Sequence, residues 1–128
     1  MAERVLLDAD VLIDYLRDVP EAVAYLESLE GVLLVSVITV AELYAGVRDG
    51  QERAKLDAFI NAFDIVMLDR EMAIKGGLYR RDYAKSHDTG LADALIAATA
   101  EARKARLVTL NKKHFPMLTD VIVPYRKA

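Results

Sequence analysis

The chain has 128 residues, of which 54% are hydrophobic and 29% are charged, and its formal net charge is −3. This length fits one domain with a single core. The sequence contains no cysteine, which excludes a disulfide framework and a thiolate metal site. No apolar run approaches membrane-spanning length, and we expect a cytoplasmic protein without membrane contact. Because the net charge is negative, a polyanion would have to be met by a local basic surface or by a metal.

Short apolar runs alternate along the chain with stretches that have helical periodicity. This pattern predicts strands at residues 4–7, 32–35, 65–68 and 107–110, with a fifth at 121–123. It predicts helices at residues 11–17, 22–29, 37–47, 52–63, 70–85 and 90–100. Strands separated by helices indicate a three-layer α/β/α domain around a central parallel sheet of four to five strands.

Several residues are expected to mark the ends of these elements. Asp10 is placed to cap the first helix, and Gly90 to cap the last one. The pair Gly76-Gly77 is expected to interrupt the helix at 70–85.

Three acids stand within or directly after elements that are otherwise apolar: Asp8, Glu42 and Asp93. Asp8 follows the first strand, at the edge where open α/β sheets hold their ligands. Asp93 is the single charge in an alanine-rich helix, where a carboxylate needs donors, a cation or a proton. Capping at the third helical position is the structural alternative for Asp93. If the three acids converge, carboxylate oxygens without His or Cys suit Mg²⁺ or Mn²⁺, and phosphodiester hydrolysis is the chemistry such an ion favours.

Four motifs resemble those of the PIN domains, and among them the VapC-type toxins of toxin-antitoxin pairs. They begin at Leu7, Ser36, Leu91 and Leu107 and read LDADVLID, SVITVAEL, LADALIAA and LVTLN. The resemblance implies a single PIN domain over residues 1–128 and a Mg²⁺-dependent endoribonuclease, homodimeric and inhibited by a cognate antitoxin. It also assigns catalysis and metal ligation to Asp8, Glu42 and Asp93. Asn111 stands where many members carry a fourth acid, and this leaves the number of metal ions open.

Other residues are expected to support such a site. Thr39 lies one turn before Glu42 and could orient its carboxylate. Thr109 closes a strand, where a structural role is the commoner one, and His114 is expected to pack with Phe115 under the last loop. The first candidates for RNA phosphate contacts are Lys112 and Lys113, followed by Arg80, Arg81 and Lys85, although each basic residue taken singly favours an ordinary solvated surface.

Three alternatives use the same residues differently. A haloacid-dehalogenase-type phosphatase would use Asp8 and Asp10, but the later paired-acid motif is missing. A receiver domain would accept a phosphoryl group on Asp69, after the third strand, but this alternative leaves Glu42 and Asp93 unexplained. A non-catalytic PIN-like module that binds RNA or protein is consistent with Asn111.

Overall fold

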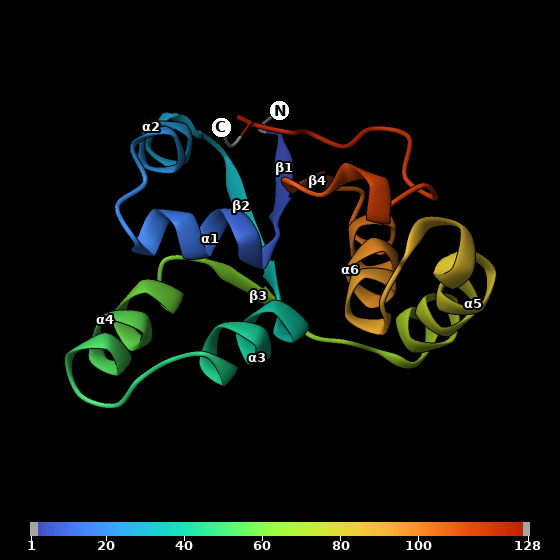
Figure 1. Cartoon of the computed structure of the whole chain (residues 1–128), viewed down its shortest axis with the longest axis horizontal. Coiled ribbons are helices and arrows are strands. Elements are labelled where there is room, and N and C mark those ends of the chain that lie inside the picture. The colour runs from blue at the N-terminus through green and yellow to red at the C-terminus, as the bar shows by residue number, and fades with distance from the viewer. Residues whose placement is uncertain (1–2, 127–128) are drawn as a thin grey trace.

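The computed structural model describes residues 3–126, and its centre is a parallel sheet with strand order β3-β2-β1-β4 (Figure 1). The strands are β1 (Arg4–Leu7), β2 (Val32–Ser36), β3 (Asp64–Val66) and β4 (Arg106–Val108). The helices are α1 (Ala9–Leu16), α2 (Pro20–Ser28), α3 (Val37–Ala45), α4 (Gln51–Ile60), α5 (Arg70–His87) and α6 (Leu91–Ala102), with a 3₁₀ turn, η1 (Lys112–His114), after β4. Within residues 3–126, no helix is both long and apolar enough to cross a membrane.

Neighbouring residues of each strand enter two different cores, because side chains alternate across a sheet. Val5 and Leu7 pack in one core with residues of α1, α3 and α4, whereas Leu6 packs in a second core with residues of α5 and α6. Figure 1 shows α1, α2 and α4 on one side of the sheet and α5 and α6 on the other. This arrangement confirms the three-layer α/β/α prediction.

The predicted strand ends differ from the observed ones near the end of the chain. β4 ends at Val108, earlier than predicted, because the backbone N–H of Leu110 donates to the Asp10 carboxylate. The expected fifth strand is reduced to a single parallel bridge between Val108 and Ile122. The sheet therefore has four strands among the described residues.

Two acids noted in the sequence, Asp8 and Asp93, lie at the N-termini of α1 and α6. The N-cap of α1 is Asp8, whose carboxylate accepts from the N–H of Ala9 at 2.8 Å, so the prediction that Asp10 caps this helix was wrong. Gly90 is the N-cap of α6 as expected, and its N–H donates to Asp93 at 3.4 Å. Asp8 therefore couples the end of a strand to the start of a helix.

The predicted interruption of the helix at Gly76-Gly77 was also wrong. α5 runs without a break from Arg70 to His87. Gly76 is buried against α6, where a Cβ atom would lie 2.6 Å from Cδ2 of Leu95, whereas Gly77 is exposed. Glycine at position 76 thus allows close packing of two helices, which periodicity alone does not reveal.

Candidate functional site

Asp8 lies at the carboxyl end of β1 and is almost fully buried, with 7% of its surface exposed. The register of β1 and β4 pairs Leu7 with Val108, which places Asp8 beside Thr109. One carboxylate oxygen of Asp8 accepts from the N–H of Ala9, and the other accepts from the Thr109 hydroxyl at 2.8 Å. The local fold therefore fixes both oxygens of this acid.

Asp10 connects the first motif to the fourth. Its Oδ2 accepts from the N–H of Leu110 at 2.9 Å and from Nδ2 of Asn111 at 3.1 Å, and the Thr109 hydroxyl lies 3.2 Å away. Its Oδ1 accepts from the N–H of Val11 at 2.7 Å. These contacts give Asp10 a structural role between α1 and the segment after β4.

The contact between Asp10 and Asn111 gives a physical reason for an amide at position 111. We expect Asn111→Asp to lower stability at pH 8 by about 1–3 kcal/mol, because it replaces a donor with a second carboxylate about 3 Å from Asp10. The double variant Asp10→Asn/Asn111→Asp restores a donor and acceptor pair and should recover much of the loss. Chemical unfolding of the wild type, the two single variants and the double variant measures the coupling energy between positions 10 and 111. Additive effects of the two substitutions would contradict the expected recovery.

Glu42 and Asp93 complete the group of acids at this end of the sheet. Partial desolvation, followed by the charges of Asp93 and Asp10, raises the pKa of Glu42, although this side chain is still exposed to solvent. Burial and the charge of Asp10 raise the pKa of Asp8 to about 7, with a smaller contribution from Glu42. Desolvation also raises the pKa of Asp10. Acids from three distant segments therefore act on one another electrostatically.

This group, which we call the acid cluster (Asp8, Asp10, Glu42 and Asp93), fits a hydrated divalent cation by its chemistry. Its donors are carboxylate oxygens, and the charges that act most strongly on them are those of other acids. Within residues 3–126, no three His, Cys, Asp or Glu side chains are close enough as they stand to hold an ion directly. Mg²⁺ typically keeps several waters and uses one or two carboxylates, so the donor set suits this ion without three direct ligands.

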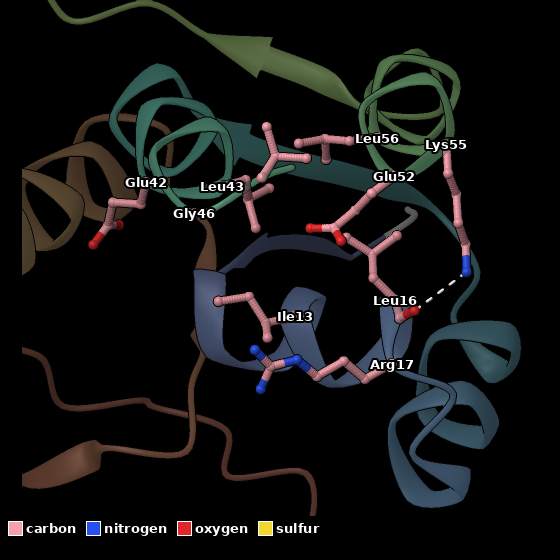
Figure 2. A pocket seen from close by; sticks show the side chains of 10 residues that line it. Ile13, Leu16, Arg17, Glu42, Leu43, Gly46, Glu52, Lys55 and Leu56 are labelled. Atoms are coloured by element: carbon pink, nitrogen blue, oxygen red, sulfur yellow. Dashed lines mark hydrogen bonds between the residues drawn. The ribbon is translucent and has the colours of Figure 1, made fainter. Parts of the chain in front are cut away.

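A pocket of about 160 Å³ lies between α1, α3 and α4, with Glu42 at its edge. Its apolar lining includes Ile13, Leu43 and Leu56. Figure 2 shows the Glu42 carboxylate directed away from Leu43 and Leu56, so the acid lies at the border of this apolar surface. Glu42 is exposed and has no hydrogen-bond partner in the described part of the chain, which leaves both of its oxygens available.

Thr39 and Thr109, the two threonines expected to support the site, differ in their contacts. The Thr39 hydroxyl is fully buried and has no hydrogen-bond partner among the described residues, so no such bond orients Glu42. Thr109 does contact the site, through its bond to Asp8. Asp69, the acceptor in the receiver alternative, instead caps α5 by accepting from the N–H of Met72 at 2.9 Å.

The candidate RNA-binding residues occupy two places. Lys112 and Lys113 are exposed in η1, directly after Asn111 and next to the acid cluster. Arg80 and Arg81 are exposed on α5, which packs on α6 (Figure 1), and Arg81 forms an ion pair with Asp82 at 2.9 Å. The first pair directly follows Asn111, which bonds to Asp10, whereas the second lies on the helix that packs on α6.

His114 contacts the acid cluster, although its sequence pattern gave no sign of a polar partner. Its Nδ1 lies 3.1 Å from Oδ2 of Asp93, and its backbone carbonyl accepts from the Thr89 hydroxyl at 2.8 Å. Phe115 is buried, as expected for packing under the last loop. A polar residue directly before a buried aromatic side chain was the only signal in the sequence that could have suggested this contact.

A parallel α/β/α fold with an acid cluster beyond the carboxyl ends of β1 and β4 defines an α/β protein with a candidate metal centre. The PIN domain family model matches residues 5–118, and the chain belongs to this family.

Relatives in this family are named as ribonucleases or toxins. Ribonuclease VapC10 of Mycobacterium tuberculosis is 39% identical over 124 residues, which cover 94% of this chain and 92% of that protein. A toxin-antitoxin complex from Klebsiella pneumoniae contains a chain with a TM-score of 0.84 and 27% identity, and the match covers 96% of this chain and 99% of the other. VapBC2 from Rickettsia felis, bound to a promoter DNA fragment, gives a TM-score of 0.75 at 27% identity, covering 92% and 95% of the two chains.

Proposed function

We propose that this chain is a Mg²⁺-dependent endoribonuclease of the VapC type that hydrolyses RNA phosphodiester bonds, with Mn²⁺ as a substitute ion. The observation that carries the proposal is the acid cluster, in which burial of Asp8, partial desolvation of Glu42 and neighbouring charge raise the pKa of both acids. Desolvated carboxylates that repel one another favour a cation over solvent. The relative named Ribonuclease VapC10, 39% identical, supports RNA as the substrate.

Each part of the cluster has a role in this proposal. Asp8, Glu42 and Asp93 hold the ion, which when bound supplies an activated water and neutralises charge at the scissile phosphate. Thr109 keeps Asp8 in place through a hydrogen bond. The Nδ2 of Asn111 donates to Asp10, which leaves the side-chain carbonyl oxygen of Asn111 as an uncharged ligand for the ion. The exposed side chains of Lys112 and Lys113, and after them Arg80 and Arg81, are the proposed contacts with RNA phosphates.

The proposal includes two protein partners. The first is a cognate antitoxin, supported by the toxin-antitoxin complexes with similar chains and by the apolar pocket beside Glu42. The second is another copy of this chain, for which Ile74 and Leu78 offer apolar surface one turn apart on α5, 50% and 44% exposed. A cytoplasmic location fits both partners.

Two experiments on the antitoxin-free protein test this function: calorimetric titration with Mg²⁺ and an RNA cleavage assay. We expect the wild type to bind Mg²⁺ and to cleave RNA, with a chelator abolishing cleavage. Asp93→Asn should lose both binding and cleavage while it stays folded. The products should carry 5′-phosphate and 3′-hydroxyl ends, as expected for attack by an activated water. Asp69→Asn is the matched control, because Asn is an equally good N-cap for α5 and position 69 lies outside the acid cluster.

Two results would contradict this proposal. A folded wild-type protein that neither binds the ion nor cleaves RNA would favour a non-catalytic module that binds RNA or protein. Products with 2′,3′-cyclic phosphate ends would instead show attack by the ribose 2′-hydroxyl. Unfolding of Asp93→Asn would point to the capping contact with Gly90 as the main role of that acid.

A further inference from the structure

We propose that His114 is a positioning residue for Asp93, holding its carboxylate through the hydrogen on Nδ1. The inference rests on the proposed function, because it assigns Asp93 to a metal centre. The observation behind it is the 3.1 Å contact between Nδ1 of His114 and Oδ2 of Asp93, two side chains from segments 21 residues apart. An ionised carboxylate only accepts hydrogen bonds, so Nδ1 carries the hydrogen in this contact.

The contact uses only one oxygen of Asp93. Oδ2 accepts from His114 and, at 3.4 Å, from the N–H of Gly90. Among the described residues, Oδ1 has no hydrogen-bond partner and stays available for an ion. Donors that occupy one oxygen of a carboxylate fix its orientation and leave the other oxygen free to ligate.

The backbone of His114 is itself held in place. Its carbonyl accepts from the hydroxyl of Thr89, which is 1% exposed, and its N–H donates to the carbonyl of Asn111 at 3.0 Å. The next residue, Phe115, is 1% exposed and packs in the core shared with α6. A ring on an anchored backbone can therefore hold Asp93 with little loss of side-chain entropy on metal binding.

Three variants separate the hydrogen bond from the charge and the volume of the ring. His114→Asn places an amide N–H at the position of Nδ1, whereas His114→Gln places it at the position of Nε2. His114→Phe keeps a planar ring without a donor. Calorimetric titration of Mn²⁺ into the folded, metal-free proteins should show roughly 10- to 100-fold weaker binding for Phe and Gln. Affinity close to that of the wild type is expected for Asn.

Each outcome of this titration has one meaning. Unchanged Mn²⁺ affinity in the Phe and Gln variants would show that the contact only tethers η1 to α6 and would overturn the inference. Tighter binding in the Phe variant would overturn it too, because it would mean that His114 acts as a repelling positive charge. No Mn²⁺ binding by the wild type would overturn the metal centre itself, which distinguishes the failure of the proposed function from that of the inference.

A second measurement leaves His114 itself unchanged. The sequence has only two histidines, so ¹⁵N-detected ring spectra of the wild type and of His87→Gln assign His114 directly. We expect His114 to show the hydrogen on Nδ1 in the metal-free protein. A neutral ring with its hydrogen on Nε2 would contradict the proposed bond to Asp93.

Discussion

Asp8→Asn is expected to abolish RNA cleavage and at the same time to stabilise the metal-free protein at pH 8. Asp8 is 7% exposed, and burial together with the charge of Asp10 raises its pKa from the ordinary 3.8 to about 7. The ionised form is therefore disfavoured in the folded state. Asparagine removes this cost and keeps an oxygen for the N–H of Ala9. Loss of a metal ligand should reduce cleavage by at least about 100-fold.

The sign of the pH dependence follows from the two pKa values of Asp8. Between about pH 4 and pH 7 the folded protein binds a proton that the unfolded chain has already released, so stability falls as pH rises through this window. At about 1.4 kcal/mol per pKa unit, the loss for Asp8 amounts to a few kcal/mol. The raised pKa of Asp10 and of Glu42 acts in the same direction.

Thermal unfolding in the presence of a chelator measures this effect. The melting temperature of the wild type should fall from pH 5 to pH 8, and that of Asp8→Asn should fall less. Mg²⁺ should raise the melting temperature more at pH 8 than at pH 6, because the ion competes with protons for the carboxylates. Asp49→Asn removes an exposed acid and serves as the control for net charge. A wild-type melting temperature that stays constant from pH 5 to pH 8 would show that ionised Asp8 does not destabilise the folded protein.

The layers and the sheet direction could be predicted because they follow from periodicity. Apolar runs such as the one from Val5 to Leu7 are buried on both faces, which is typical of a parallel sheet. The exact ends were less predictable, because they depend on contacts between distant segments. Leu110 leaves the sheet when its N–H bonds to Asp10, 100 residues earlier. No local pattern encodes such a contact.

For the candidate site, the acids could be predicted from the sequence but their hydrogen bonds could not. Asp8, Glu42 and Asp93 were visible because each is an acid in an apolar surrounding, which is costly without compensation. The hydrogen bonds that hold Asp8 and Asp93 were not visible. Glu42 is exposed, although the other residues of α3 are mostly apolar. His114 was missed because its partner lies 21 residues away on another helix. Sequence reasoning therefore found the charges but not the hydrogen bonds that arrange them.

Gly76 and Gly77 are expected to respond in opposite directions to the same substitution. A Cβ at position 76 would lie 2.6 Å from Cδ2 and 3.1 Å from Cα of Leu95, so α5 and α6 would have to move apart. Such overpacking costs about 1–3 kcal/mol and exceeds the gain in helix propensity. Apart from its chain neighbours and the nearby backbone of α5, no described atom lies within 4 Å of a Cβ at position 77, where alanine should stabilise the exposed helix by about 1 kcal/mol.

Denaturant unfolding of Gly76→Ala and Gly77→Ala tests the two signs against each other. Leu95→Ala provides the third arm, because it removes the Cδ2 contact and leaves only the backbone contact at 3.1 Å. The cost of Gly76→Ala should therefore be smaller in the Leu95→Ala background, as a coupling energy of a double-mutant cycle. Since α6 carries Asp93 in its first turn, we expect Gly76→Ala also to weaken metal binding, whereas Gly77→Ala leaves it unchanged. Equal effects of the two alanines on stability would show that the helices have room to spare at position 76 and that its burial is incidental.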